Sequence, residues 1–516
     1  MSEDNHMPIL KTLFDAPAQD WTRFLFFLVG IILFIAAAEK TRSRLGWSPE
    51  VNRKIVHVGT GVLIVFSPLF FISAKPLLWM ALLFMFVNFI GVEAGLLKGM
   101  HDTRRKSFGT VFYPMTFFIL VAACWNGHKA VLILSMMILA FSDAAAAAVG
   151  ELMKKPHEYR LGTDKKSLEG SAAMFLATLA LVWLFLPPLA QRDGILVSWR
   201  MAGWIALVAA IVSTALEAVS SSGSDNLTAP LGAAFILNFM LSRDAGANLQ
   251  LTLGLVLALA TAVISLRLKF LSPSGSVATF ILATLIFGVG GWTWAVPILV
   301  FFVTSSLLSK FGRTRKKRFD LVFEKSGTRD VGQVIANGGA AGILVMLYGL
   351  FPDPRWFIPY LGALAAVNAD TWATELGTFS KSKPVLITSM KAVPTGTSGA
   401  VSLLGLSASL AGSLVIACSG YFFSPSQAGP EYWGRIFWYV ASAGFIAALA
   451  DSVLGATIQG QYRCRVCGKI TEKRIHCGGG PTVRESGIKW INNDRVNLAC
   501  SIVGAGVVWM LAGFLK

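Results

Sequence analysis

Acidic side chains that interrupt apolar segments are the residues of this sequence best suited to do chemistry. Asp143 follows the apolar run from Val131 to Phe141 and precedes five alanines. A carboxylate is costly inside a membrane, so an acid in such a segment is a candidate functional group. Ala146 and Gly150 fall on the same helical face, which allows a ligand to approach the acid closely. The alternative is an Asp at a helix end, where it is solvated or caps the helix.

Further carboxylates lie near the next polar boundary, at Glu217 and at the pair Asp225-Asn226. Mg²⁺ in proteins usually takes one or two carboxylates together with phosphate oxygens of a bound nucleotide. We therefore predict that Asp143, Glu217 and Asp225 hold Mg²⁺.

Basic residues next to these acids predict a phosphate site. The loop 154–171 is rich in Lys and Arg and ends in Ser and Gly residues that lead into a helix, where backbone amides can hold phosphate. The spacing is not that of a Walker motif, and a solvated basic loop is the alternative. The predicted phosphate-binding residues of this half are Arg53, Lys54, Lys165, Lys166, Ser167, Gly170 and Ser171.

A histidine precedes this loop in the chain. Arg53, His57 and Gly61 are four residues apart and therefore share one helical face. Since a histidine titrates near neutral pH, we predict that His57 acts as a general base or contacts phosphate. A packing role at a helix end is the alternative.

The second half of the sequence carries its own set of polar residues. Asp370 and Glu375 lie close to an apolar run and are predicted to be catalytic. The predicted metal ligands are Asp370, Asp451 and Asp494. The predicted phosphate-binding residues of this half are Lys325, Lys391, Gly396, Thr397, Ser398 and Gly399.

The order of these polar positions occurs twice along the chain. Asp143-x-x-Ala-x-x-x-Gly150 is followed by a Ser/Gly loop and then by Glu217, whereas Asp370-x-x-Ala-x-x-x-Gly377 is followed by such a loop and then by Asp451. We interpret this order as a tandem duplication with a boundary near 240–250. The expected parts are a polar tail over 1–20 and membrane domains over 21–245 and 250–516.

Cysteines suggest a separate site near the C-terminus. Cys464-x-x-Cys467 is followed, a short loop later, by His476-Cys477. Thiolates and an imidazole at such spacing suit a small Zn²⁺ site, although the loop is short for a zinc finger. Reduced, unligated thiols are the alternative.

Composition places these residues in a membrane protein. Hydrophobic residues make up 54% of the 516 positions, charged residues 14%, and mean hydropathy is +0.63, whereas soluble domains carry about 25% charged residues. Apolar runs long enough to cross a bilayer recur along the chain and predict an all-α, polytopic helical bundle of about 14 spans.

The net charge of +17 arises from 45 Lys and Arg residues against 28 Asp and Glu. The cations cluster in short loops between spans, which is typical of loops on the cytoplasmic face. We therefore expect a multi-pass protein of the cell (inner) membrane with its sites on that face. This pattern argues against nucleic acid as a partner.

Two known families share these motifs. The first half resembles the phytol kinase and dolichol kinase family through Arg53-Lys54-x-x-His57, Ser142-Asp143-x-x-Ala146, Lys166-Ser167-x-Glu169-Gly170-Ser171, Glu217 and Asp225-Asn226. It departs from that family after Gly150, where a second Gly is often found. The second half resembles the family that contains phytyl-phosphate kinase, most extensively through Asn368-Ala369-Asp370-Thr371-Trp372-Ala373-Thr374-Glu375-x-Gly377, with Gly396–Gly399, Asp451-Ser452 and Trp490–Asn497.

These resemblances imply a fusion of two membrane lipid kinases. The first half would phosphorylate a prenyl alcohol, such as phytol or geranylgeraniol, with CTP and Mg²⁺, and the second would convert the monophosphate into the diphosphate. The partners would be a lipid alcohol within the bilayer and a nucleotide. Two alternatives stay open, a cytidylyltransferase of the phosphatidate type and a transporter, because transporters are also commonly built from repeats.

Overall fold

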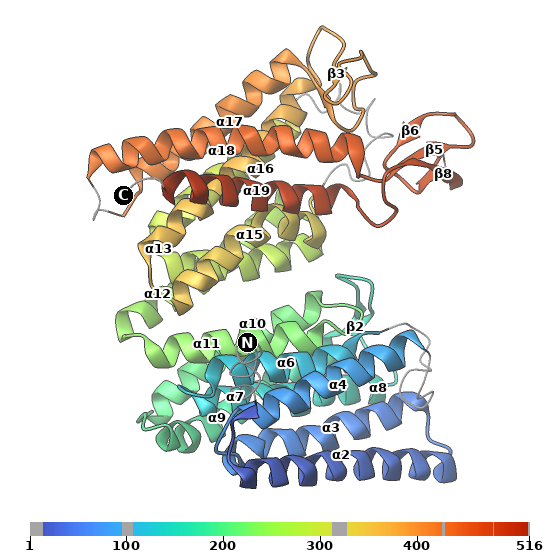
Figure 1. The fold of residues 1–516 in the computed structure, drawn as a ribbon, viewed down its shortest axis with the longest axis vertical. Helices are drawn as coiled ribbons and strands as arrows, with labels where there is room; N and C mark the ends of the chain where they lie inside the picture. The colour runs from blue at the N-terminus through green and yellow to red at the C-terminus, as the bar shows by residue number, and fades with distance from the viewer. Residues whose placement is uncertain (1–13, 95–106, 312–327, 426–428, 478, 514–516) are drawn as a thin grey trace, which may run out of the picture. The chain divides into compact units, whose positions relative to one another are not determined.

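The computed structural model describes residues 14–94, 107–311, 328–425, 429–477 and 479–513. In these residues the chain is mostly helical (Figure 1). Twelve helices are long and apolar enough to cross a membrane, and the shorter apolar helix Gly109–Cys124 adds to them. The expected polytopic helical architecture is confirmed.

The chain divides into two compact units, Met1–Asp244 and Ala245–Lys516. Within the first unit, α7 continues through a π-helical turn into α8. The helices α2, α3 and α4 form the blue part of Figure 1. The helices of this unit are α2 (Ala18–Leu45), α3 (Pro49–Phe70), α4 (Lys75–Glu93), α6 (Gly109–Cys124), α7 (Lys129–Met137), the π-helical turn η1 (Ile138–Ser142), α8 (Asp143–Leu152), α9 (Leu168–Arg192), α10 (Trp199–Val219) and α11 (Asp225–Ser242).

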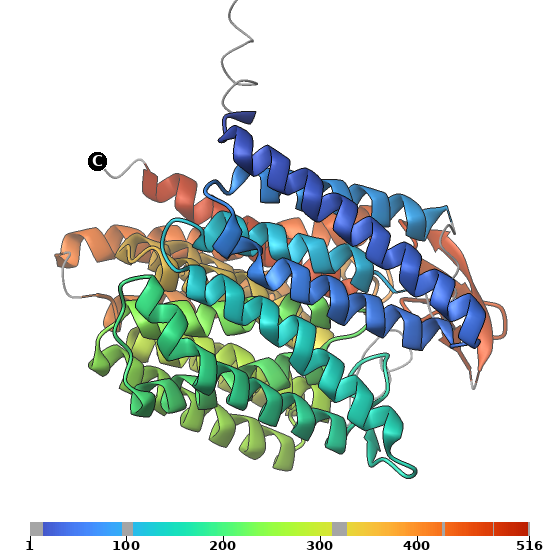
Figure 2. The ribbon, with the colours of Figure 1, turned by 90° about the horizontal axis from the view of Figure 1, so that it is seen from below.

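The second unit is built from longer helices and carries a small sheet. Figure 1 shows α18 and α19 side by side, with the strands of that sheet beyond their ends, and Figure 2 shows these strands at the right of the view. Its helices are α12 (Ala245–Arg267), α13 (Pro273–Lys310), α15 (Val331–Leu350), the 3₁₀ turn η2 (Pro354–Trp356), α16 (Phe357–Gly377), α17 (Leu403–Phe422), α18 (Pro430–Thr457) and α19 (Asn493–Gly513).

Serine residues fix where several of these helices begin. The hydroxyl oxygens of Ser48, Ser198 and Ser272 each accept a hydrogen bond from a backbone N–H in the first turn of the following helix. Such caps satisfy N–H groups that have no partner within the helix. The long helix α13 contains a break at Gly291, where φ is 64° and ψ is −158°. Glycine adopts this backbone conformation without a steric penalty, so the break divides α13 into two shorter segments.

Short strands occur only in loops among the described residues, and the all-α expectation did not include them. β1 (Glu158–Tyr159) pairs with β2 (Lys166–Ser167), and β3 (Val385–Leu386) pairs with β4 (Ala400–Val401), both antiparallel. A four-stranded sheet of order β6-β5-β8-β7 lies between α18 and α19 in the sequence. Its strands are β5 (Gln461–Cys464), β6 (Ile470–Thr471), β7 (Ile475–His476) and β8 (Gly480–Ser486).

One arrangement of elements recurs in both units. A helix with the Asp-x-x-Ala-x-x-x-Gly sequence, α8 or α16, leads into a two-stranded hairpin and then into a serine-capped helix, α9 or α17. Ser167 accepts from the N–H of Gly170, and Ser402 accepts from the N–H of Gly405, each at 3.1 Å. The counterpart of Ser167 is thus Ser402, which lies beyond the loop 395–399 that the sequence pattern matched to it. Val401 therefore occupies the position that corresponds to Lys166.

Candidate functional sites

The first unit contains a cavity of about 1110 Å³ whose wall is part polar and part apolar. The polar part comprises the acids, cations and small residues singled out in the sequence. The apolar part comes from α2, α3, α4 and α6 and includes Ile31, Ile35, Ile64, Met80, Phe84 and Phe117. Such a wall suits a ligand with a charged end and a hydrocarbon tail.

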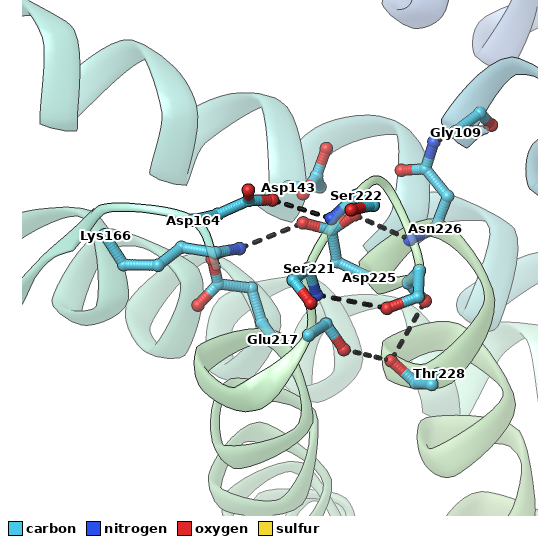
Figure 3. Close-up of polar contacts among 12 residues, drawn as sticks. Gly109, Asp143, Asp164, Lys166, Glu217, Ser221, Ser222, Asp225, Asn226 and Thr228 are labelled. Carbon is cyan, nitrogen blue, oxygen red and sulfur yellow. Dashed lines mark hydrogen bonds and ion pairs between the residues drawn. The ribbon is translucent and has the colours of Figure 1, made fainter. Parts of the chain in front are cut away.

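Lys166 is at the centre of the polar part of this cavity. Its Nζ donates to Glu217 Oε1 at 2.5 Å and to Asp225 Oδ2 at 2.9 Å. Figure 3 shows the lysine, presented by β2, meeting carboxylates from the last turn of α10 and the first turn of α11. Burial alone would lower the pKa of Lys166, but the Asp225 and Glu217 carboxylates raise it above its usual range. The lysine therefore stays protonated and cannot serve as a base near neutral pH.

The turn between α10 and α11 holds Asp225 in place. The Ser222 N–H donates to Asp164 Oδ2 at 2.7 Å, and the Asn226 side-chain amide donates to the Gly109 carbonyl at 2.9 Å (Figure 3). Gly223 has φ of +85°, and a Cβ there would lie 2.5 Å from the Gly109 backbone nitrogen. Only glycine fits this close approach, so the turn positions Asp225 against β2 and α6.

Asp143 and His57 lie on the same cavity. Asp143 interacts electrostatically with Asp225, Lys166 and Glu217. At the π-helical turn the Asp143 N–H donates to the Ile138 carbonyl, and the Leu139 carbonyl accepts from His57 Nε2 at 2.9 Å. A carbonyl has no proton, so His57 Nε2 is the donor, and only Nδ1 could accept a proton from a ligand.

The other predicted residues of the first half also line this cavity. Lys54 pairs with Glu151 at 2.5 Å, and Lys165 pairs with Glu158 at 2.6 Å. Ser171 bonds the Tyr159 hydroxyl at 2.6 Å. Gly170 packs so tightly that a Cβ would lie 2.9 Å from the Ala146 carbonyl oxygen. Arg53 and Ser167 complete the set, so this part of the chain brings together residues more than 170 positions apart.

The second unit contains a cavity of about 520 Å³. Asp370, Asp451, Asp494 and Glu375 all line it, as does the loop that includes Gly396, Thr397, Ser398 and Gly399. Asp370 and Asp451 interact electrostatically with each other. Adjacent carboxylates repel each other, so a cation bound between them would stabilise the pair.

The two lysines predicted for this site are not among its described lining residues. Lys391 is exposed outside the cavity, and Lys325 lies outside the described residues. The lining cations are Lys269, Lys310 and Arg329 instead. Lys310 Nζ donates to the Leu268 carbonyl at 3.0 Å. These three cations are far from Asp370 in the sequence, so the sequence pattern did not indicate that they would line the same cavity.

Glu472 is a further lining residue that sequence reasoning missed. Its Oε1 accepts from Ser398 Oγ at 2.8 Å and from Gln459 Nε2 at 2.9 Å. It also interacts electrostatically with Asp451. The residue lies in a loop between the cysteines and the histidine, where no apolar pattern marks it.

The Cys and His residues near the C-terminus come together as the sequence predicted. One donor atom from each of Cys464, Cys467, His476 and Cys477 lies within 4.8 Å of the other three. Backbone N–H groups, that of Cys467 first and then that of Val466, lower the pKa of Cys464 to about 6 despite its burial. This cluster can hold a metal ion.

These features define a multi-pass helical membrane protein with a carboxylate-rich cavity in each unit. Residues 256–505 match the model of the family described as Integral membrane protein DUF92. The Arabidopsis thaliana protein PGR is 34% identical over 253 residues, which are 45% of this chain and 86% of that protein. The chain belongs to the DUF92 family of integral membrane proteins.

Two other relatives bear on the chemistry. Phytol kinase of Synechocystis sp. is 32% identical over 200 residues, 38% of this chain and 81% of that protein. Protein VTE6 of Arabidopsis thaliana is 26% identical over 253 residues, 48% of this chain and 66% of that protein. The expected relationship to phytol kinase is confirmed. No solved structure matches the chain.

Proposed function

We propose that this protein is a CTP-dependent prenyl-alcohol kinase of the cell (inner) membrane. The first unit would convert an alcohol such as phytol or geranylgeraniol into its monophosphate, and the second would convert that product into the diphosphate. The observation that carries the proposal is the first cavity, where an apolar wall meets the cluster of Lys166, Glu217, Asp225 and Asp143. The relationship to phytol kinase supports the same chemistry.

The donor set of the first cavity fits a magnesium ion. Glu217 Oε2 is buried and has no hydrogen-bond partner within the described part of the chain, so it keeps a lone pair for a cation. Asp143, Glu217 and Asp225 would hold Mg²⁺, which when bound neutralises charge on the nucleotide phosphates. Lys166, Lys165, Arg53 and Lys54 would bind phosphate oxygens, and the Gly170-Ser171 turn would offer backbone N–H groups.

The transfer step needs a group that takes the alcohol proton. The alcohol oxygen attacks the γ-phosphorus of CTP, the bond to the β,γ-bridging oxygen breaks, and CDP leaves. Lys166 is excluded as the base because it stays protonated. Asp143 and His57 Nδ1 are our candidates on this cavity, and either would accept the hydroxyl proton as the new P–O bond forms.

The second unit would repeat this chemistry with a different set of cations. Asp370, Asp451 and Asp494 would hold Mg²⁺ and Glu375 would assist catalysis, while the loop Gly396–Gly399 would bind phosphate. Lys269, Lys310 and Arg329, which line this cavity, would lie near the phosphates in place of the predicted Lys391. The recurring helix, hairpin and capped helix support a duplication, and a monophosphate retained in the bilayer by its hydrocarbon tail would stay available to a second site on the same chain.

A radiolabel assay on membranes containing the full chain tests this function. CTP labelled at the γ-phosphate should transfer label to a prenyl alcohol, giving a monophosphate and then a diphosphate. Asp143→Asn should abolish the first product, and Asp370→Asn should leave only the monophosphate. Asp353→Asn is the matched control, because Asp353 lies in an exposed turn outside both cavities.

Parallel reactions with CTP labelled at the α-phosphate separate the alternatives. Transfer of that label to lipid, with release of pyrophosphate, would replace the kinase proposal with a cytidylyltransferase. Absence of label in any lipid with every nucleotide tried would reject both enzymes and favour transport.

A further inference from the structure

The cluster of Cys464, Cys467, His476 and Cys477 has the geometry of a tetrahedral metal site. Zn–S bonds of about 2.3 Å place two sulfurs of a tetrahedral zinc site about 3.8 Å apart. The four donor atoms already lie within 4.8 Å of one another. His476 Nδ1 is 3.5 Å from Cys467 Sγ and 3.1 Å from Cys477 Sγ. All four cysteine and histidine side chains therefore converge on one point.

The ligand chemistry identifies the ion. Three thiolates and one imidazole form a soft donor set that is typical of structural Zn²⁺ sites. Mg²⁺, which the cavities would take, prefers oxygen ligands and does not suit this set. All six cysteines are free in the structure, so none of the three cysteines in the cluster is part of a disulfide.

The small sheet around the cluster has little core of its own. Its buried side chains are Tyr462, Cys464, Thr471 and His476, and two of these four are cluster residues. Strands as short as β6 and β7 gain little from pairing alone. A metal ion that joins the end of β5 to β7 would supply the missing stability, as it does in other small domains.

The chain between the cysteines and the histidine carries Glu472 into the second cavity. Glu472 directly follows β6, five residues after Cys467 and four before His476. Its carboxylate accepts hydrogen bonds from Ser398 and Gln459 on the cavity wall. An ion that fixes both ends of this segment therefore also fixes where Glu472 lies.

We propose that Cys464, Cys467, His476 and Cys477 bind one structural Zn²⁺ that holds Glu472, a positioning residue, in the wall of the second cavity. Loss of zinc releases Glu472 and with it the loop 395–399 that it contacts through Ser398. The effect on phosphoryl transfer rests on the proposed function of the second unit, whereas the zinc site and its structural link do not.

Metal analysis of the purified full chain tests the site itself. We expect one zinc per chain, and its loss in Cys467→Ser. Cys418→Ser is the matched control, because Cys418 is an exposed free cysteine outside the cluster, and it should keep full zinc content. Zinc-free protein that folds, or equal zinc content in the two variants, would overturn the proposal.

Hydrogen exchange of the backbone over residues 395–399 tests the link to the cavity. Removal of zinc should speed exchange there about tenfold, because the Ser398 contact with Glu472 is lost. Glu472→Ala should have the same effect with zinc still bound, whereas Glu472→Gln keeps the accepting oxygen and should preserve protection. Unchanged exchange after zinc loss would refute the link.

Activity then separates this inference from the proposed function. Glu472→Ala, with zinc still bound, should lower formation of the diphosphate and leave the monophosphate unaffected, whereas Glu472→Gln, which keeps the contact with Ser398, should retain diphosphate formation. A wild-type chain that makes no diphosphate would count against the kinase role of the second unit, and the zinc and exchange results would still stand.

Discussion

Replacing Lys166 by methionine tests whether the ion cluster of the first cavity is both a structural and a functional unit. Lys166, Glu217 and Asp225 have side-chain exposures of 15%, 6% and 19%. Both the Glu217 and the Asp225 carboxylate accept a hydrogen bond from Lys166 Nζ. Without the ammonium group, these two carboxylates face each other with no cation between them. At roughly 5 Å and an effective dielectric constant of 20, their repulsion is about 3 kcal/mol. We therefore expect Lys166→Met to lower the free energy of unfolding by about 3–5 kcal/mol.

The double variant Lys166→Met/Glu217→Gln removes the repulsion along with the lysine. It should recover most of the lost stability, because one buried charge then remains in place of two, but not the transfer of phosphate from CTP. Lys165→Met is the matched control: this lysine pairs with Glu158 where both are half exposed, so its loss should cost less than about 1 kcal/mol.

Unfolding of the purified protein by titration with SDS in mixed micelles measures these differences, and the γ-label assay measures transfer. Equal stability of wild type and Lys166→Met would refute the electrostatic reasoning. Full activity of the double variant would show that Lys166 is needed only to balance the carboxylates.

Three further outcomes follow from the same geometry. His57→Ala should destabilise the first unit by about 1–3 kcal/mol, measured by the SDS titration, because the Leu139 carbonyl loses its donor. Gly399→Ala should block the second phosphorylation while the first continues, because a Cβ at φ of +77° would lie 2.5 Å from the Ser452 carbonyl oxygen. Because the Lys166 pKa is raised on folding, its stabilisation is complete below its unfolded pKa of about 10.4 and declines only as pH passes the higher folded value. The stability difference between wild type and Lys166→Met, measured by the SDS titration, should therefore not fall between pH 6 and 9.

Local patterns in the sequence were enough to predict the helices and the Cys/His cluster. Long apolar runs form helices in a membrane because the backbone must satisfy its own hydrogen bonds there. The cluster was predictable because its four ligands lie within 14 residues, from Cys464 to Cys477. The small sheet escaped prediction because β6 and β7 have only two residues each and β8 is mostly exposed, so these strands show no regular apolar alternation.

The sequence alone determined that this is a membrane protein, that it is helical, and which residue types are available for chemistry. Which of those residues meet was decided only by the tertiary structure. Lys166 reaches Glu217 and Asp225, which follow it by 51 and 59 positions. Among the described residues, the cations that line the second cavity are Lys269, Lys310 and Arg329, and Lys391 is not one of them. The physical reason is that helix packing and turns such as that at Gly223 set these distances, and a one-dimensional pattern of residue types does not contain them.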